Sequence, residues 1–284
     1  MGDAMTATAG PATAATLAAT SAMTSGLPTI GLPELLGLAG LQTRVDRKYL
    51  VPVSTLAALP AADPAMRVLE IDGVVSHAYA SRYEDTATRE SYLLAAHGRP
   101  SRYKVRTRTY CDSGLEVLEV KTRSRRGQTV KDRLPLEEAS RFDVREFVPS
   151  TIRERTGIPF RGALAPVLDV HYDRTTCYLP GSGARATVDT GLAWTDLRTG
   201  RRLGLSGVAI VETKSLGAPS PLDRLLWRMG HRPVRLSKFA CGLALTAAAE
   251  ATGDVVPPGG EPAGLPANRW HRTLTRLAPH TVPC

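Results

Sequence analysis

The chain has 284 residues, 43% of them hydrophobic and 22% charged, which is ordinary for a globular protein with one large domain or two small ones. Its 36 basic and 27 acidic residues give a net charge of +9, which indicates a polyanionic partner: nucleic acid, anionic lipid or a phosphorylated small molecule. No run approaches the roughly 18 apolar residues of a transmembrane helix. The four cysteines are too far apart for a zinc site or a disulfide framework and fit a reducing compartment.

The two ends of the chain are predicted to lie outside the folded domain. Residues 1–40 are of low complexity, without the basic and apolar regions of a signal peptide, and are expected to be disordered apart from one short helix in PELLGLAG. Residues 251–284 form a Pro/Gly-rich tail that is expected to be extended or disordered. A single domain over residues 41–250 remains, without internal repeats.

Strands dominate this predicted domain. Alternating patterns predict strands over residues 44–51, 77–84, 101–110, 115–124, 167–178, 184–189 and 207–215. Helical patterns occupy residues 136–157, 220–230 and 237–253, and the second of them carries a core-facing stripe of Leu222, Leu225, Leu226 and Met229. Many antiparallel strands with helices outside them predict an α+β fold built on a closed or nearly closed β barrel.

The basic residues gather in one part of the chain. Residues 99–133 contain eleven basic and four acidic residues, a net charge of +7. Along the strand predicted there, Lys104, Arg106 and Arg108 alternate with small or β-branched residues, so the three cations share one face. For a single strand, the simplest interpretation is a charged face in water and an apolar face on the core.

The same pattern recurs on other predicted strands, which the simple interpretation does not explain. On each of three further strands, polar and charged residues share one face of that strand. The sets are Glu119, Lys121 and Arg123; Arg185, Thr187 and Asp189; and Glu212 with Lys214. Cations two residues apart on a strand lie about 7 Å apart and repel each other by about 2 kcal/mol at an effective dielectric near 20. If these cations were buried without partners, the free-energy cost of burying them would exceed a domain's stability of roughly 5–15 kcal/mol. We therefore expect a wet channel that holds a chain of phosphates, in which the few carboxylates hold a divalent cation.

Nine motifs occur in the order found in a known family: RVDRKY, YEDT, RYKVRTRTY, LEVKTR, KDR, YDR, RATVD, VETK and SKF. Together, over about residues 41–245, they resemble the VTC domain, the polyphosphate polymerase domain of the vacuolar transporter chaperone complex, in the triphosphate tunnel superfamily. The resemblance implies an antiparallel β tunnel with helices packed outside and a basic lumen that binds polyphosphate or nucleoside triphosphate.

Matched motif by motif, the resemblance implies a set of site residues. The catalytic cations would be Arg106, Arg108, Lys121, Arg174 and Arg185. Further phosphate-binding cations would be Lys48, Lys131, Arg133, Lys214 and Lys238. Glu212 matches the family's metal-binding glutamate, and Glu119 is a second candidate ligand for Mn²⁺ or Mg²⁺. Asp189 is open between a metal and a pair with Arg185, while Lys104, Arg123, Arg125 and Arg126 match no clear family position.

The activity implied by the resemblance is that of a polyphosphate polymerase, a phosphotransferase that moves the γ-phosphate of ATP onto a polyphosphate chain. The expected partners are ATP and polyphosphate, in the cytoplasm, with a separate membrane protein for any translocation. The opening RVDRK lacks the ExExK signature of the hydrolytic branch, which disfavours a triphosphatase without excluding it. A non-catalytic polyphosphate-binding module also stays open. Nucleic-acid binding is disfavoured because no known module is present and few strand positions are aromatic.

Overall fold

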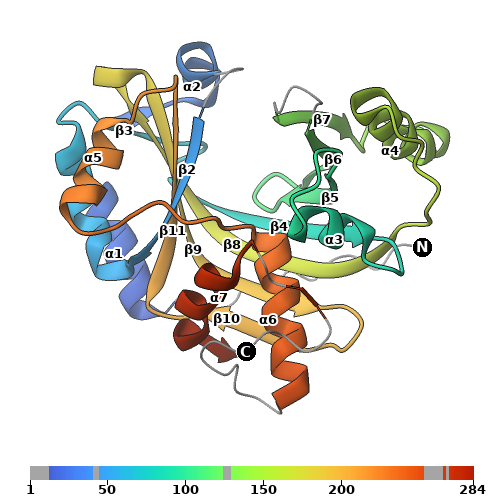
Figure 1. Cartoon of the computed structure of the whole chain (residues 1–284). Helices are drawn as coiled ribbons and strands as arrows, with labels where there is room; N and C mark the ends of the chain where they lie inside the picture. The colour runs from blue at the N-terminus through green and yellow to red at the C-terminus, as the bar shows by residue number, and fades with distance from the viewer. Residues whose placement is uncertain (1–12, 41–44, 124–128, 253–264, 267–268) are drawn as a thin grey trace.

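The structure, a computed structural model, describes residues 13–40, 45–123, 129–252, 265–266 and 269–284 (Figure 1). Its main sheet is antiparallel, with the strand order β2-β11-β9-β8-β4-β5-β6-β7. These strands are β2 (Val45–Pro52), β4 (Ser76–Asp85), β5 (Tyr103–Tyr110), β6 (Leu115–Arg123), β7 (Thr129–Pro135), β8 (Ala165–Leu179), β9 (Ala184–Asp196) and β11 (Val208–Ser215). Four short strands extend it: β1 (Thr29–Ile30), β3 (Arg67–Leu69), β10 (Arg202–Leu205) and β12 (Thr281–Pro283).

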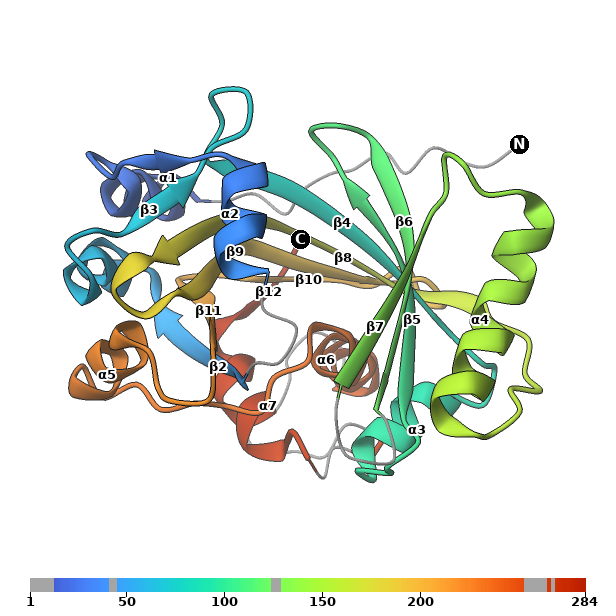
Figure 2. The same cartoon turned by 90° about the horizontal axis from the view of Figure 1, so that it is seen from above.

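The sheet folds into two arms that face each other (Figures 1 and 2). Strands β8 and β4 form the base, β9, β11 and β2 form the first arm, and β5, β6 and β7 form the second. Among the described residues no pairing joins the edge strands β2 and β7, so hydrogen bonds do not close the sheet into a barrel. The predicted α+β fold of antiparallel strands with helices outside is confirmed.

Alternation along the strands gives each arm an apolar outer face under helices. On the second arm, Val105 and Val120 pack against Val148 and Ile152 of α4 (Arg141–Thr156). On the first arm, Val211 and its neighbours pack under α1 (Ala14–Thr24), α5 (Pro221–Arg228) and the 3₁₀ helix η1 (Val53–Ala62). Since the outer faces are covered by helices, the opposite, charged faces point toward the space between the arms.

The base of the sheet is covered by α3 (Glu90–Ala96), α6 (Lys238–Thr252) and α7 (His271–Leu277). A close approach seats α6: a Cβ atom at Gly242 would lie 2.2 Å from the ring of Trp194, so only glycine fits there. The indole Nε1 of Trp194 donates a hydrogen bond to the carbonyl of Lys238 at 2.8 Å. These contacts fix the first turn of α6, and with it Lys238, at the floor of the space between the arms.

The short helix expected in PELLGLAG is present, but both ends of the described chain are otherwise more ordered than the sequence predicts. Residues 14–39 form α1, β1 and α2 (Leu32–Ala39), and Met23 is buried in the outer core of the first arm. After residue 268, α7, the 3₁₀ helix η3 (Ala278–His280) and β12 pack back onto the sheet, and Trp270 joins the core. The physical reason is that apolar side chains of each segment, Met23 and Trp270 among them, are buried in core clusters formed with elements distant in sequence. Residues 1–12 and 253–264 lie outside the described residues.

Along the described part of the chain, no helix has both the length and the apolar character that crossing a bilayer requires. The remaining 3₁₀ helix, η2 (Pro180–Ser182), connects β8 with β9.

Candidate functional site

The strand register aligns the charged residues of each arm into rows. On the second arm, one row runs across Tyr83, Arg106, Glu119 and Arg133, and the next across Lys104, Lys121 and Lys131. On the first arm, Lys48 lies opposite Glu212, and Lys214 lies between Asp46 and Arg185. Because cross-strand partners share a face, all of these side chains stand on the inner faces of the sheet. We call the space between these inner faces the lumen.

Glu119 is the counterion at the centre of the second arm. Its carboxylate is 2% exposed and contacts three cations: Arg106 at 2.5 Å, Arg133 at 3.2 Å, and Lys131. Burial alone would raise the pKa of Glu119, but the nearby cations outweigh it and hold that pKa far below its usual range. Glu119 therefore stays ionised and offsets part of the positive charge of this arm.

Asp189 has the same role at the base of the lumen. Arg174 donates to it in fork geometry, from Nε at 2.6 Å and from Nη2 at 2.8 Å, and Lys238 at the start of α6 also contacts it. Although burial opposes ionisation, Arg174 and Lys238 hold the pKa of Asp189 far below its usual range. The sequence left open whether Asp189 approaches a metal or pairs with Arg185. In the structure Asp189 pairs with Arg174 and Lys238.

Glu212 is the carboxylate of the first arm. Its two oxygens lie 2.9 Å from the Nζ atom of Lys48 and 2.5 Å from that of Lys214. The two ammonium groups outweigh the effect of burial and keep the pKa of Glu212 well below its usual range. Burial lowers the pKa of Lys214 to about 8, although the negative charges of Glu212 and Asp46 act to raise it.

Among the described residues, no carboxylate forms an ion pair with Lys104, Lys121 or Arg108 of the lumen. Lys104 donates from Nζ to the hydroxyl of Ser237 at 2.7 Å. Burial, together with repulsion from Lys121, Arg106 and Lys48, lowers the pKa of Lys104 to about 7. Arg108 is 6% exposed and donates to the Tyr172 hydroxyl at 3.0 Å, while its Nε atom has no hydrogen-bond partner in the described structure.

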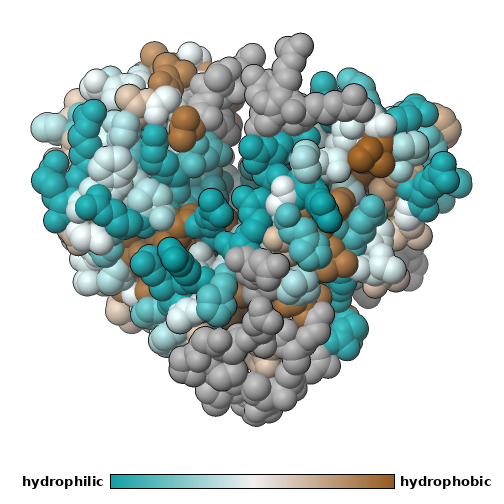
Figure 3. All heavy atoms as spheres, in the orientation of Figure 1, coloured by the Kyte–Doolittle hydropathy of each residue, from teal (hydrophilic) through white to brown (hydrophobic). Residues whose placement is uncertain are grey.

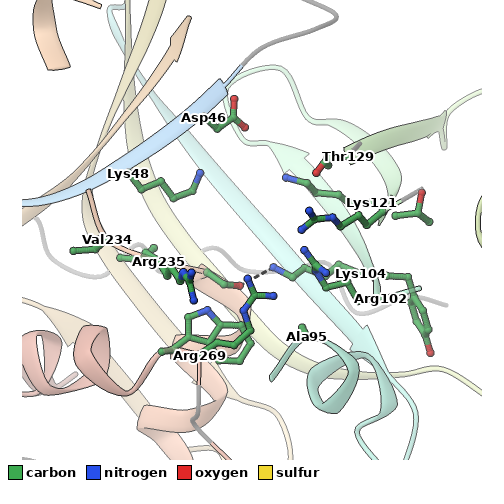
Figure 4. A pocket seen from close by; sticks show the side chains of 16 residues that line it. Asp46, Lys48, Ala95, Arg102, Lys104, Lys121, Thr129, Val234, Arg235 and Arg269 are labelled. Carbon is green, nitrogen blue, oxygen red and sulfur yellow. Dashed lines mark hydrogen bonds between the residues drawn. The ribbon is translucent and has the colours of Figure 1, made fainter. Parts of the chain in front are cut away.

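A cavity of about 320 Å³ opens between the arms next to these residues (Figure 4). Its walls contain Asp46 and seven cations: Lys48, Arg102, Lys104, Lys121, Arg123, Arg235 and Arg269. The labelled lysines of β2 and of the second arm point toward each other across it (Figure 4). On the molecular surface, hydrophilic side chains gather where the two arms face each other (Figure 3).

The structure brings the site residues expected from the sequence onto the walls of one lumen. The ten expected cations come from β2, β5, β6, β7, β8, β9, β11 and the first residue of α6: Lys48, Arg106, Arg108, Lys121, Lys131, Arg133, Arg174, Arg185, Lys214 and Lys238. Whether each of them binds phosphate stays a prediction. Lys131, 29% exposed, lies deeper than Arg133, which is 55% exposed. Arg125 and Arg126 fall outside the described residues.

Other residues of the site were not found from the sequence. The sequence patterns assign no role to Lys104, nor to the three tyrosines that face the lumen cations. Arg106 donates to the Tyr83 hydroxyl at 2.9 Å, and Arg174 lies over the rings of both Tyr79 and Tyr172. One pattern in the sequence could have indicated two of these tyrosines. Tyr79 and Tyr83 lie on the same face of β4, and the register places that face beside the cations of β5.

The two expected metal ligands differ in how well they suit a metal. Glu119 already contacts three cations, so its oxygens are poorly placed to bind an ion. Glu212 contacts two cations, Lys48 and Lys214, and its side chain is 13% exposed, so it could supply one carboxylate to an Mg²⁺ or Mn²⁺ ion whose other ligands come from outside the protein. Among the residues that the structure describes, no group of three or more His, Cys, Asp or Glu side chains could hold a metal by itself.

Comparison with known proteins gives one family match. The model of the VTC domain matches residues 43–247. No curated protein matches the chain.

Similar solved structures are remote. A Bacillus halodurans protein proposed to be an adenylate cyclase has a TM-score of 0.44 and 14% identity, over 68% of this chain and 93% of that one. A Hippeastrum protein proposed to be an adenylyl cyclase, and described as having a dominant triphosphatase activity, has a TM-score of 0.38 and 14% identity, over 76% and 98%. The protein PH1819 of Pyrococcus horikoshii has a TM-score of 0.38 and 12% identity, over 71% and 98%.

Proposed function

Because this chain belongs to the VTC domain family, we propose that its lumen binds chained phosphates and transfers the γ-phosphate of ATP onto a polyphosphate chain. Membership of the family supports a domain that handles phosphoryl groups. That the reaction is polymerisation is our proposal. The substrate pair would be ATP and polyphosphate.

The observation that supports the proposal best is the excess of positive charge on the lumen walls. Three carboxylates, Glu119, Asp189 and Glu212, are contacted by seven cations: Lys48, Arg106, Lys131, Arg133, Arg174, Lys214 and Lys238. Lys104 and Arg108 add charge without a carboxylate partner among the described residues. A linear polyanion between the arms would satisfy both walls at once, since it carries charge at short, regular intervals.

The proposed transfer needs no covalent bond to the protein. A terminal oxygen of the chain attacks the γ-phosphorus of ATP, a new P–O–P bond forms, and the bond between the γ-phosphorus and the bridging oxygen breaks to release ADP. The lumen's part is alignment and charge neutralisation. Arg106, Arg108 and Arg174 would hold phosphate oxygens in fork geometry, and Lys48, Lys121 and Lys214 would add point charges.

Glu212 would hold Mn²⁺ or Mg²⁺ together with substrate phosphate oxygens, and the ion would neutralise charge that develops in the transfer. Lys48 and Lys214 now occupy both oxygens of this carboxylate. Incoming phosphates would draw these ammonium groups away from Glu212. In this proposal the carboxylate becomes available to an ion only when substrate is bound, which limits metal binding by the empty lumen.

The test is to incubate the purified protein with ATP and Mn²⁺ and to separate the products on a gel. Long-chain phosphate with release of ADP would support the polymerase. Free phosphate without polymer would instead identify a triphosphatase, and neither product, with retained binding of tripolyphosphate, would identify a binding module.

A pair of variants ties the activity to the lumen. Arg106→Ala should abolish most of the activity because it removes a cation of the lumen wall. Arg153→Ala, on the exposed surface of α4, removes the same charge far from the lumen and should leave activity unchanged. Equal activity in both variants would place the reaction elsewhere.

A further inference from the structure

Four arginines line the cavity drawn in Figure 4, beside the lysines of the lumen. We call Arg102, Arg123, Arg235 and Arg269 the mouth cluster. In the described structure none of these four guanidinium groups forms an ion pair with a carboxylate, in contrast to Arg106, Arg133 and Arg174 inside the lumen. Their arrangement therefore gathers positive charge at one cavity, whose wall contains a single carboxylate, that of Asp46, among the described residues.

Two members of the mouth cluster continue the rows of the lumen. Arg102 precedes β5 and lies in phase with Lys104, while Arg123 ends β6 in phase with Lys121. The backbone N–H of Arg123 donates to the carbonyl of Arg102 at 3.2 Å, so the two residues are neighbours across the strands. The same cavity touches Lys48, Lys104 and Lys121 of the lumen. The mouth cluster is thus continuous with the lumen.

Arg235 comes from the segment between α5 and α6. The N–H of Val234 donates to the carbonyl of Lys48 at 2.7 Å, which holds this segment against β2. The hydroxyl of Thr273 on α7 donates to the carbonyl of Arg235 at 2.8 Å. The position of Arg235 therefore depends on both the first arm and the C-terminal segment.

Arg269 is contributed by a segment outside residues 43–247, the part of the chain that the family model matches. The next residue, Trp270, is 6% exposed, and its ring lies 5.9 Å from that of Tyr92 on α3. The hydroxyl of Tyr92 donates to the carbonyl of Pro266 at 3.1 Å. The segment is thus anchored on the helices below the second arm, with the guanidinium of Arg269 at the cavity.

The four charges disfavour one another. Burial, followed by repulsion from Arg123 and Arg269, lowers the pKa of Arg102. Burial, followed by repulsion from Arg235 and Arg123, lowers the pKa of Arg269. An anion bound at the mouth would relieve this repulsion without first breaking an ion pair with the protein.

We infer that the mouth cluster is a second phosphate subsite, completed by the C-terminal segment, that holds the part of a polyphosphate chain extending out of the lumen. This inference rests on the proposed function, since it takes the lumen to hold the other part of the same chain. A linear chain is the occupant that the arrangement favours, because Arg102 and Arg123 continue the lumen rows and one cavity touches both sets. A compact polyphosphate such as inositol hexakisphosphate also presents several phosphate groups, but it could bind at the mouth cluster without entering the lumen.

The test compares binding of tripolyphosphate, long-chain polyphosphate and inositol hexakisphosphate, without metal or ATP, by calorimetry. The variant Arg235→Ala/Arg269→Ala is matched by Arg272→Ala/Arg276→Ala, which removes two exposed arginines from α7. The first variant should weaken long-chain binding about tenfold or more, the usual effect of losing charge-assisted hydrogen bonds. It should change tripolyphosphate binding less than about twofold, and the matched variant should change neither. Arg269→Lys, which keeps the charge, should recover part of the loss.

Three results would overturn the inference: no effect of the mouth variant on long chains, equal weakening of long chains and tripolyphosphate, or an effect on inositol hexakisphosphate alone. Equal melting temperatures of the two double variants would exclude unfolding as the cause of a loss. If tripolyphosphate failed to bind even the unchanged protein, the proposed function would fail. Long-chain binding that still depended on the mouth would then support the subsite by itself.

Discussion

The lumen and its mouth are both strongly basic, but only the lumen carries its own counterions. Inside, Glu119, Asp189 and Glu212 each hold two or three cations. At the mouth, no carboxylate pairs with Arg102, Arg123, Arg235 or Arg269 among the described residues. A phosphate chain in the lumen must therefore compete with existing ion pairs, whereas one at the mouth meets guanidinium groups that no carboxylate of the described residues holds. The ion pairs of the lumen fix the geometry of its cations, as phosphoryl transfer requires. The mouth needs only to hold a chain, for which a less fixed geometry is enough.

The largest expected effect concerns the one lumen carboxylate that suits a metal. Glu212→Gln should lower Mn²⁺-dependent product formation about 100-fold or more, since metal bridging of phosphates contributes several kcal/mol to such a transition state. Binding of tripolyphosphate without metal should persist, because the surrounding cations remain. Initial rates and calorimetry measure the two quantities.

The matched control for Glu212 is Glu154→Gln, a change at a carboxylate 71% exposed on α4. It should leave the rate unchanged. A Glu212→Gln enzyme with full activity would contradict the metal role of this residue.

The next effect tests whether the lumen carboxylates stand in for phosphate. Glu119→Gln leaves Arg106, Lys131 and Arg133 without their shared buried counterion, which should destabilise the empty protein by about 3 kcal/mol, or roughly 6–12 °C in Tm. Tripolyphosphate should then raise the Tm of the variant more than that of the unchanged protein. Thermal unfolding with and without ligand gives both values.

Glu116→Gln, at an exposed position of the same strand, is the control for the stability effect. It removes the same charge without leaving a buried cation and should change Tm little. An equal ligand-induced shift in the Glu119 variant and in the unchanged protein would contradict the idea that phosphate replaces this carboxylate.

A smaller effect follows from three buried lysines whose ordinary pKa is 10.5. The pKa falls to about 6 for Lys131, to about 7 for Lys104 and to about 8 for Lys214. All three pKa values are depressed, so between about pH 6 and 10.5 the unfolded chain binds more protons than the empty folded protein. The stability of the empty protein should therefore rise with pH in that window. Phosphate favours the charged forms, so binding at pH 8 should take up protons.

Calorimetry in buffers of different ionisation enthalpy measures this proton uptake. Lys104→Met should reduce the uptake and flatten the rise in stability above pH 7. If phosphate binding released protons at pH 8, or took up the same number in the variant, the assignment of the titrating group to Lys104 would be wrong.

The smallest effect concerns salt. The arginines of the mouth have no carboxylate partners among the described residues, so the attraction they exert on phosphate depends on screening. The Debye length falls from about 10 Å at 0.1 M to about 3 Å at 1 M ionic strength. The advantage of long-chain polyphosphate over tripolyphosphate in affinity should therefore shrink as salt is added. Affinity ratios that stay constant with salt would argue against an electrostatic mouth.

The sequence predicts the inner wall of the lumen better than its surroundings. Alternation along β5, β6 and β11 is enough to place Arg106, Glu119 and Glu212 on one face, because side chains in a strand alternate by geometry alone. Which carboxylate meets which cation could not be predicted, since the pairs depend on strand register: Arg174 reaches Asp189 only because β8 pairs with β9.

The mouth could not be predicted from the same pattern. Arg269 follows a Pro/Gly-rich run and has no periodicity that points to a lumen, and its position is set by Trp270 packing on α3. Arg235 lies outside the regular elements. Its position depends on the bond from the N–H of Val234 to the carbonyl of Lys48 and on the bond from the Thr273 hydroxyl to its own carbonyl. Such positions depend on long-range packing, which local sequence rules do not contain.

The most direct test of the whole account is a crystal structure of the protein soaked with tripolyphosphate. The account predicts phosphate groups between the two arms, within hydrogen-bond distance of Arg106 on one wall and of Arg174 and Lys214 on the others. Phosphate found only on the outer helices, with the ion pairs of Glu119, Asp189 and Glu212 undisturbed, would contradict it.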